Sequence, residues 1–246
     1  MDRSARTPVN LVAYTVIAAF TVLTVVEWWP WVAAGGDGLV GTDFLLYRDA
    51  AARFLSGDSF YLQHQLAGPY VVTAGDVLYP PPALLLFIPF TLLPAVLWWA
   101  IPLAVVAWIV AWHRPSPVAW AGIALCVWFP TTILHTVHGN PFIWAVMAVA
   151  LSTRWKWPGA LVLLKPTLLP FALIDLRHRV WWKGLAGLAM ISLVFLPMWP
   201  DYIAVLRNAQ GTGGLGYSLQ EFPAMAIPVF AWLGSTRRRD QAGISA

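Results

Sequence analysis

A short polar segment between two apolar stretches carries the residues best suited to chemistry. Residues 41–61 read GTDFLLYRDAAARFLSGDSFY and contain three aspartates and two arginines. A carboxylate acts as a general base when it lies within hydrogen-bond reach of a hydroxyl group. Asp43 is the first of these acids, and it follows an apolar run of membrane-spanning length. We therefore expect chemistry at a boundary between lipid and water.

A helix starting near Asp43 would position this segment. Asp43 and Tyr47 are four residues apart, so they would share one helix face. The alternative role for Asp43 is that of a helix N-cap. Asp49 and Arg53 have the spacing of a surface ion pair, and Gly57 with Asp58 indicates a turn that closes the helix.

Further polar candidates stand at the ends of other apolar runs. Tyr79 precedes three prolines and either forms a rigid entry into the next helix or binds a phosphate or sugar. His135 and His138 could share a metal ion with Asp43, or they are ordinary interfacial histidines. Lys165 lies in an apolar segment, so it either snorkels to the interface or takes an anionic partner such as a lipid phosphate.

The composition indicates an integral membrane protein. Of 246 residues, 59% are hydrophobic and 11% are charged, and the mean hydropathy is +0.68. A soluble domain is about 25% charged, and the 16 tryptophans suit membrane interfaces. The short basic clusters between apolar runs favour topology control over nucleic-acid binding. The single Cys126 excludes a disulfide framework within the chain.

Apolar runs of about 20 residues predict membrane spans. The expected apolar segments are 11–31, 82–112, 118–134, 141–151, 158–174, 182–198 and 223–233. We predict an all-α, polytopic transmembrane bundle with about seven to eight membrane segments, some kinked or re-entrant. It forms a single integral membrane domain over 1–246, with an outer loop and short interfacial helices at 34–82, a second outer loop at 199–222 and a basic cytoplasmic tail at 235–246. We expect the first span to be retained rather than cleaved, with Glu27 near its outer end.

The positive-inside rule orients these segments. All the basic clusters fall in the cytoplasm if segment 82–112 crosses the membrane once and segment 158–174 is re-entrant, turning back at Lys165-Pro166. The alternative is that segment 158–174 crosses the membrane once. The acids, histidines and amides then lie outside. We expect a multi-pass protein of the plasma (inner) membrane with an extracytoplasmic site.

Several motifs, in this order, resemble those of one enzyme family. They are Asp43-Phe-x-x-Tyr47, Leu55-x-Gly57-x-x-x-Tyr61, Tyr79-Pro-Pro-Pro with Leu93-Pro94, Gly139-Asn140, Gly159, Lys165-Pro166, Trp199-Pro-Asp-Tyr202 and Tyr217-Ser218-Leu219. The chain resembles the polyprenol-phosphate-mannose-dependent mannosyltransferases of glycosyltransferase family 87, within the GT-C class. Family members usually carry Gly-Gln where this chain has Gly139-Asn140, and they are usually longer, so we expect a shortened member.

The resemblance implies an inverting sugar transfer. A polyprenyl-phosphate sugar would be the donor, a glycan or glycolipid the acceptor, and Asp43 the general base. Lys165, Arg48 or His138 would stabilise the leaving phosphate. The residues expected to bind substrate are Tyr47, Arg48, Tyr79, His138, Asn140, Lys165 and Glu221. No cofactor or metal site is predicted, and the need for a divalent ion stays open.

Two other functions are compatible with the sequence. The protein could bind a lipid-linked sugar without consuming it, as an assembly factor on the same scaffold. It could also be a small transporter, but the chain lacks the internal repeat that such proteins often carry.

Overall fold

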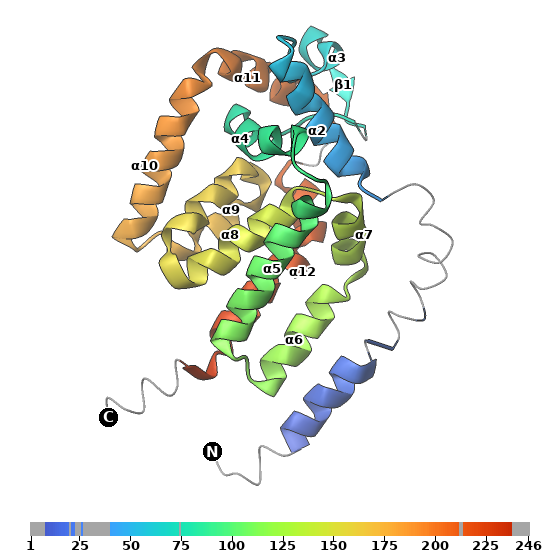
Figure 1. The fold of residues 1–246 in the computed structure, drawn as a ribbon, viewed down its shortest axis with the longest axis vertical. Helices are drawn as coiled ribbons and strands as arrows, with labels where there is room; N and C mark the ends of the chain where they lie inside the picture. The colour runs from blue at the N-terminus through green and yellow to red at the C-terminus, as the bar shows by residue number, and fades with distance from the viewer. Residues whose placement is uncertain are drawn as a thin grey trace.

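The structure is a computed structural model, and it describes residues 8–19, 21–22, 26, 40–73, 75–211 and 214–237. Glu27, residues 34–39 of the predicted outer loop and the basic tail beyond Arg237 lie outside the described residues, as does much of the second half of the predicted first span. The described chain is mostly helical, which confirms the all-α prediction (Figure 1).

The α-helices are Pro8–Ala19, α2 (Thr42–Leu55), α3 (Gln63–Ala67), α4 (Leu84–Phe87), α5 (Val96–His113), α6 (Pro117–Val127), α7 (Pro130–His138), α8 (Phe142–Trp155), α9 (Leu169–Ala172), α10 (Arg179–Val194), α11 (Trp199–Asn208) and α12 (Phe222–Leu233). Short 3₁₀ helices connect them: η2 (Pro81–Ala83), η3 (Ile88–Thr91), η4 (Trp157–Leu164), η5 (Pro166–Leu168), η6 (Leu173–Asp175), η7 (Leu196–Met198) and η8 (Gly214–Glu221). Strands β1 (Tyr70–Val71) and β2 (Ala209–Gln210) form a small parallel pair.

Among the described residues, one helix is long and apolar enough to cross a membrane by itself. This helix is α5, with 18 residues, and the number rises to three if each of two bent helix pairs forms one span. The other apolar helices are shorter; α8, for example, has 14 residues. The predicted seven to eight membrane segments are therefore not confirmed.

Prolines divide the apolar runs into more and shorter helices than predicted. The predicted span 118–134 is two helices, α6 and α7, which meet at a 58° bend just before Pro130. Proline lacks an N–H donor and clashes with the preceding turn, so it suits the first position of a new helix. Pro89 and Pro94 likewise interrupt 82–112, whereas α5 continues through Pro102.

The break at Lys165-Pro166 is confirmed. The 3₁₀ helix η4 ends at Leu164, and Lys165 has non-helical dihedral angles before η5 begins at Pro166. Helix η4 packs between α8 and α10. These short pieces hold the Lys165 side chain inside the protein, where 8% of the residue is exposed.

The two predicted outer loops contain regular structure and pack together. The loop 199–222 begins with α11, which is bent by 77° from α10. Strand β1 pairs with β2, Tyr70 opposite Ala209, and α3 packs on α11. Figure 1 shows α2, α3 and α11 gathered at one end of the molecule.

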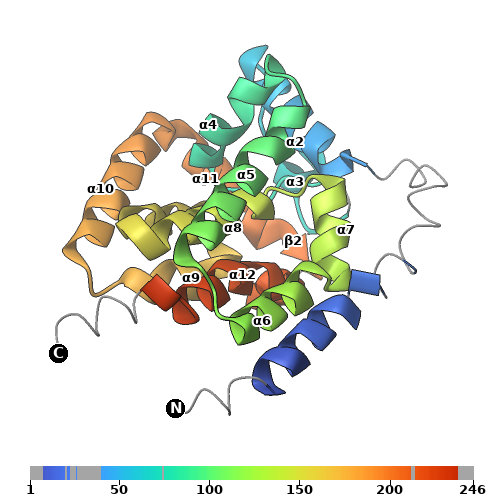
Figure 2. The ribbon, with the colours of Figure 1, turned by 60° about the horizontal axis from the view of Figure 1, so that its bottom comes forward.

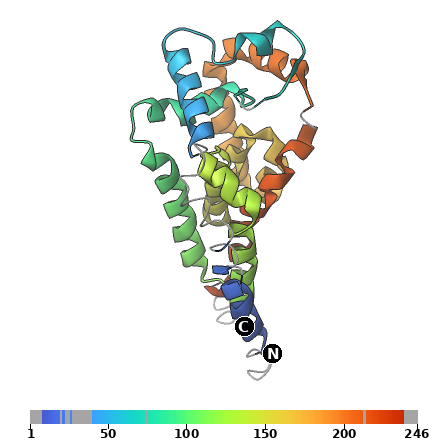
Figure 3. The same ribbon diagram turned by 90° about the vertical axis from the view of Figure 1, so that its right-hand side faces the viewer.

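Helix α5 extends from the end of the molecule with α2, α3 and α11 to the opposite end. In Figure 3 it runs from the broad end, with α2 and α11, toward the narrow end, with the helix Pro8–Ala19. That N-terminal helix lies beside α6, near Val118 and Ala121 (Figure 2). Helices α5, α8 and α12 pack against one another and form the centre of the fold.

Candidate functional site

Asp43 and Asn140 meet at the start of two helices. Asn140 Nδ2 donates a hydrogen bond to Asp43 Oδ2 across 2.7 Å. Asp43 lies in the first turn of α2, and Gly41 occupies the N-cap position with φ 76° and no side-chain cap. The alternative N-cap role of Asp43 is therefore wrong, and its carboxylate points instead to the turn between α7 and α8. The Asp43 residue is half-buried.

The turn that carries Asn140 is a Schellman motif at the end of α7. Asn140 N donates to His135 O at 2.9 Å, and Gly139 N donates to Thr136 O at 3.0 Å. Gly139 has φ 72°, and a Cβ atom there would lie 2.7 Å from Trp99 Cζ2. Only glycine fits both the left-handed backbone and the space beside the Trp99 ring.

Two tryptophans at the start of α5 hold this turn in place through hydrogen bonds to its carbonyl groups. Trp98 Nε1 donates to Gly139 O, and Trp99 Nε1 donates to Thr136 O, each at 2.7 Å. The Trp98 and Trp99 rings also pack on Phe44, next to Asp43, with centroid distances of 5.5 and 5.4 Å. Gly41 N completes the junction by donating to Val137 O at 2.9 Å. The position of Asp43 relative to Asn140 is thus set by α2, α5 and α7 together.

Lys165 is a buried residue that contacts Asn140 and so joins the polar groups at this turn. Its Nζ donates to Asn140 Oδ1 at 3.3 Å and forms an ion pair with Glu221. The Tyr79 ring centroid lies 5.5 Å from the same ammonium group. The side chains of Lys165 and Glu221 are 10% and 2% exposed, so the charges neutralise each other in the interior.

Several buried polar atoms near these residues have no hydrogen-bond partner among the described residues. Within the described part of the protein, no hydrogen-bond partner exists for either ring nitrogen of His135, for His138 Nε2 or for Glu221 Oε2. His135 is close enough to Asp43, Lys165 and Glu221 to interact with them electrostatically. Buried polar groups are normally paired, so such atoms indicate a place for water or a ligand.

One connected polar network joins four of the predicted site residues: Asp43, Asn140, Lys165 and Glu221. The Tyr79 ring lies beside Lys165, and His138 is at the adjoining end of α7. The sequence offers His135 two roles, metal ligand or interfacial histidine. Its ring is buried without a hydrogen-bond partner among the described residues, which makes it a further candidate for binding a ligand.

Tyr47 and Arg48 make other contacts in the described part of the chain. The Tyr47 ring packs against Tyr79 and Phe87, with centroids 5.0 and 4.9 Å apart, in the aromatic core. Arg48 donates to Asp49 through Nε at 3.0 Å and Nη2 at 2.9 Å. The expected pair of Asp49 with Arg53 is therefore wrong, and Arg53 donates to Phe60 O instead.

A tyrosine of the predicted outer loop supports Tyr79. Tyr61 Oη donates to Tyr79 O at 2.9 Å. Burial, with smaller effects of Tyr202 and Asp201, raises the pKa of Tyr61 above its ordinary value. The hydroxyl therefore stays protonated and keeps the Tyr79 backbone in place beside Lys165.

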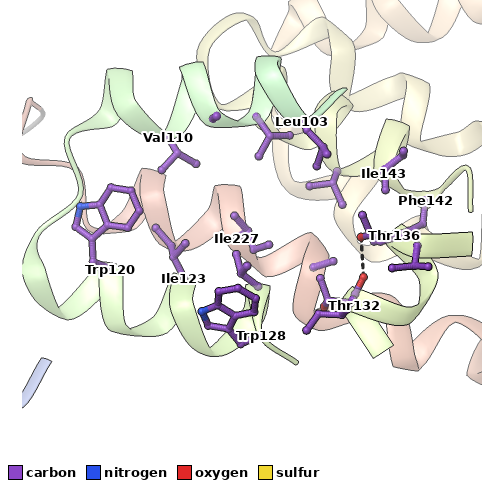
Figure 4. A pocket seen from close by; sticks show the side chains of 17 residues that line it. Leu103, Val110, Trp120, Ile123, Trp128, Thr132, Thr136, Phe142, Ile143 and Ile227 are labelled. Carbon is purple, nitrogen blue, oxygen red and sulfur yellow. Dashed lines mark hydrogen bonds between the residues drawn. The ribbon is translucent and has the colours of Figure 1, made fainter. Parts of the chain in front are cut away.

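An apolar cavity of about 420 Å³ adjoins the polar network (Figure 4). Leu103 and Val110 of α5, Ile123 of α6 and Ile227 of α12 contribute to its walls. Thr136, Val137 and Phe142 line its other end, and they flank the turn that carries Asn140. Phe142 N donates to Asn140 Oδ1 at 3.0 Å, so the cavity and the network share one turn. Ligand pockets commonly have volumes of about 300–1,000 Å³.

No metal centre is visible in the part of the chain that the structure describes, where no three His, Cys, Asp or Glu residues form a possible ligand group. No protein-family model matches the chain, and no curated protein or solved structure shows significant similarity to it.

Proposed function

We propose that the protein is a polytopic membrane glycosyltransferase. It moves a hexose, with mannose as the first candidate, from a polyprenyl-phosphate donor to a hydroxyl group of a lipid or glycan acceptor. The observation that carries the proposal is the Asp43 carboxylate, which is half-buried and hydrogen-bonded by Asn140 through Oδ2, beside an apolar cavity. Such a carboxylate is held in a fixed orientation by the amide of Asn140.

In the proposed step, the acceptor oxygen forms a bond to the anomeric carbon of the sugar. The bond between that carbon and the phosphate oxygen breaks, and its electron pair leaves with the polyprenyl phosphate. Asp43 takes the proton of the acceptor hydroxyl, and the sugar carbon is inverted. The leaving phosphate is already a stable anion, so the step needs no strong general acid.

Lys165 supports the leaving phosphate in this proposal. An ammonium group has three donors, and the hydrogen bonds to Glu221 and Asn140 use two of them. The third donor remains for a phosphate oxygen. His138 Nε2, at the end of α7, is a further buried polar atom with no partner among the described residues. In a water-poor site, such preorganised groups stabilise developing charge more strongly than they would in water.

The apolar cavity would take the first part of the polyprenyl chain. Its described lining residues are apolar except for Thr132, Thr136 and the two indole N–H groups of Trp120 and Trp128. Burial of hydrocarbon there would stabilise the bound donor by about 0.8 kcal/mol per methylene group. The shared turn would then position the phosphate next to Asn140 and Lys165.

The membrane placement belongs to the same proposal. Helix α5 would cross the bilayer, and the bent pairs α6–α7 and α10–α11 would each cross or re-enter it. The end with α2, α3 and α11 would face the extracytoplasmic side of the plasma membrane, because Arg114, Arg154 and Arg237 gather at the C-terminal end of α5.

The direct experiment supplies purified protein in nanodiscs with radiolabelled polyprenyl-phosphate-mannose and native lipid and glycan extracts. We expect release of polyprenyl phosphate and transfer of label to an acceptor. Absence of release, together with a donor-dependent rise in melting temperature, would reject the transferase and leave a binding protein.

The closed pair of Lys165 and Glu221 favours a second candidate, a non-catalytic binder of the lipid-linked sugar. In this case Glu221 keeps Lys165 neutralised, and the unpartnered histidine nitrogens hold the sugar hydroxyls. The binder predicts protection of the donor without its consumption over any incubation time.

A further inference from the structure

Two arginines and three tryptophans form a basic aromatic cluster, consisting of Trp108, Trp112, Arg154, Trp155 and Arg237. The Arg154 guanidinium carbon lies 5.7 Å from the Trp108 ring centroid and 4.7 Å from those of Trp112 and Trp155. The Arg237 guanidinium carbon lies 4.9 Å from the Trp112 ring centroid. The Trp112 indole therefore contacts both cations, and it links Arg154 of α8 to Arg237 after α12.

Hydrogen bonds fix the backbone around the cluster. His113 at the end of α5 pairs with Thr153 of α8 at 2.8 Å, one residue before Arg154. Ser235 Oγ donates to His113 O at 2.8 Å, and Thr236 Oγ1 donates to Arg114 O at 2.9 Å. The segment before Arg237 is thus held on the end of α5, so the cluster has a defined shape.

The two guanidinium groups have no acidic partner within the described residues. The nearby Lys156 differs, because Asp175 lies 3.1 Å from its ammonium group. Neither Arg154 nor Arg237 has a carboxylate within 4.0 Å in the described part of the chain, and their side chains make no hydrogen bond there. Two cations that share one indole and have no acidic partner among the described residues suit an anion, and guanidinium groups bind phosphate in a bidentate manner.

The length of α5 separates the cluster from the Asp43 network. Trp99 near the start of α5 supports the turn beside Asn140, whereas Trp108 and Trp112 lie in its last two turns. Eighteen residues of α-helix extend about 27 Å, close to the hydrocarbon thickness of about 30 Å. If the Asp43 network lies at one bilayer interface, the cluster lies at the other.

We propose that the basic aromatic cluster binds the phosphate group of an anionic phospholipid in the cytoplasmic leaflet. The exposure of Trp108 (49%) and Trp155 (40%) suits the lipid interface, and the two arginines supply N–H donors to the phosphate. Anionic lipids are attracted to basic residues at this surface. The proposal requires insertion in a membrane and is independent of sugar transfer.

Native mass spectrometry of the full-length protein tests the site. The protein is exchanged from detergent into equal amounts of phosphatidylglycerol and phosphatidylcholine, and retained lipids are counted. We expect preferential retention of phosphatidylglycerol, and Arg154→Gln/Arg237→Gln should lower its apparent affinity by about tenfold or more, because charge-assisted hydrogen bonds are lost. The matched control is Arg177→Gln/Arg179→Gln, which removes two exposed charges elsewhere.

Equal retention of the two lipids by the wild-type protein would overturn the proposal, even if the double variant fails to fold. Unchanged phosphatidylglycerol affinity in a folded double variant would also overturn it. A third arm adds inorganic phosphate or an acidic peptide to the wild-type protein. Equal competition by either one would identify a general anion site instead of a lipid site.

Discussion

Asn140 donates a hydrogen bond to Asp43 across 2.7 Å, although 97 positions separate the two residues in the chain. The same amide accepts hydrogen bonds from Lys165 Nζ at 3.3 Å and from Phe142 N at 3.0 Å. Because Oδ1 is occupied by these two donors, the amide nitrogen is directed at the carboxylate. Asn140 therefore positions Asp43 and joins it to the buried ion pair.

The variant Asn140→Leu tests this positioning role. It keeps a similar volume but removes the hydrogen bond to Asp43, which should lower kcat by about tenfold to a hundredfold, since a hydrogen bond to a charged group stabilises by about 1.5–3 kcal/mol. KM for the donor should change much less. Asn208→Leu is the control, because its amide donates to Gln65 O of α3, in a different part of the fold. Equal kcat losses in both variants would contradict the role of Asn140.

Gly139→Ala should destabilise the fold around the site. The added Cβ atom would lie 2.7 Å from Trp99 Cζ2 and 2.9 Å from Phe44 Cβ, and φ is 72°. A left-handed alanine costs about 1–2 kcal/mol, and overpacking adds about 1–3 kcal/mol. We expect a clear fall in melting temperature in detergent.

Gly187→Ala provides the matched control for Gly139→Ala. Gly187 lies in α10, and a Cβ atom there meets nothing within 4 Å. Alanine in a helix is favoured over glycine by about 0.8–1.0 kcal/mol, so this variant should melt at the wild-type temperature or above it. Equal melting temperatures of the two variants would show that the turn is not tightly constrained.

The pair of Lys165 and Glu221 should show strong coupling. Lys165→Met leaves the Glu221 carboxylate buried without its partner, and removal of one member of a buried pair costs about 3–5 kcal/mol. Lys165→Met/Glu221→Leu removes both charges and should recover much of the stability, while sugar transfer stays impaired. Thermal unfolding of both variants and of Glu221→Leu measures the coupling, and additive losses would disprove it.

Filling the apolar cavity should weaken donor binding. In Ile227→Trp, an indole would occupy part of the space of about 420 Å³ between α5, α6 and α12. KM for a long-chain polyprenyl donor should rise several-fold, whereas a donor with a single isoprene unit should be less affected. Leu233→Trp on the exposed end of α12 is the control. A chain-length dependence identical to the wild type would exclude this cavity as the lipid site.

Local sequence signals predicted part of this arrangement. Pro166 after Lys165 predicted the break that the structure contains, and Gly57-Asp58 predicted the turn after α2, where Asp58 N donates to Arg53 O. These features depend on residues next to one another, so their physics can be deduced from the sequence. The helical fold class followed from the apolar runs for the same reason.

Contacts over long sequence separations could not be predicted in this way. The bond between Asn140 and Asp43 depends on how α5 holds both helix ends, and the pair of β1 with β2 joins segments that the sequence shows only as loops. Tyr47 has the right spacing from Asp43, yet its ring packs with Phe87 because aromatic burial is more favourable there. His135 carries no distinctive signal in the sequence, since only the fold reveals that its ring is buried without partners.

The most direct test of the central claim compares Asp43→Asn with Asp58→Asn in the radiolabelled transfer assay. The asparagine at position 43 keeps the shape of the side chain but cannot accept a proton, so transfer should fall by about 10²–10⁴-fold while the donor still raises the melting temperature. Asp58 is exposed in the turn after α2, and its variant should transfer at the wild-type rate. Wild-type turnover by Asp43→Asn would contradict the account.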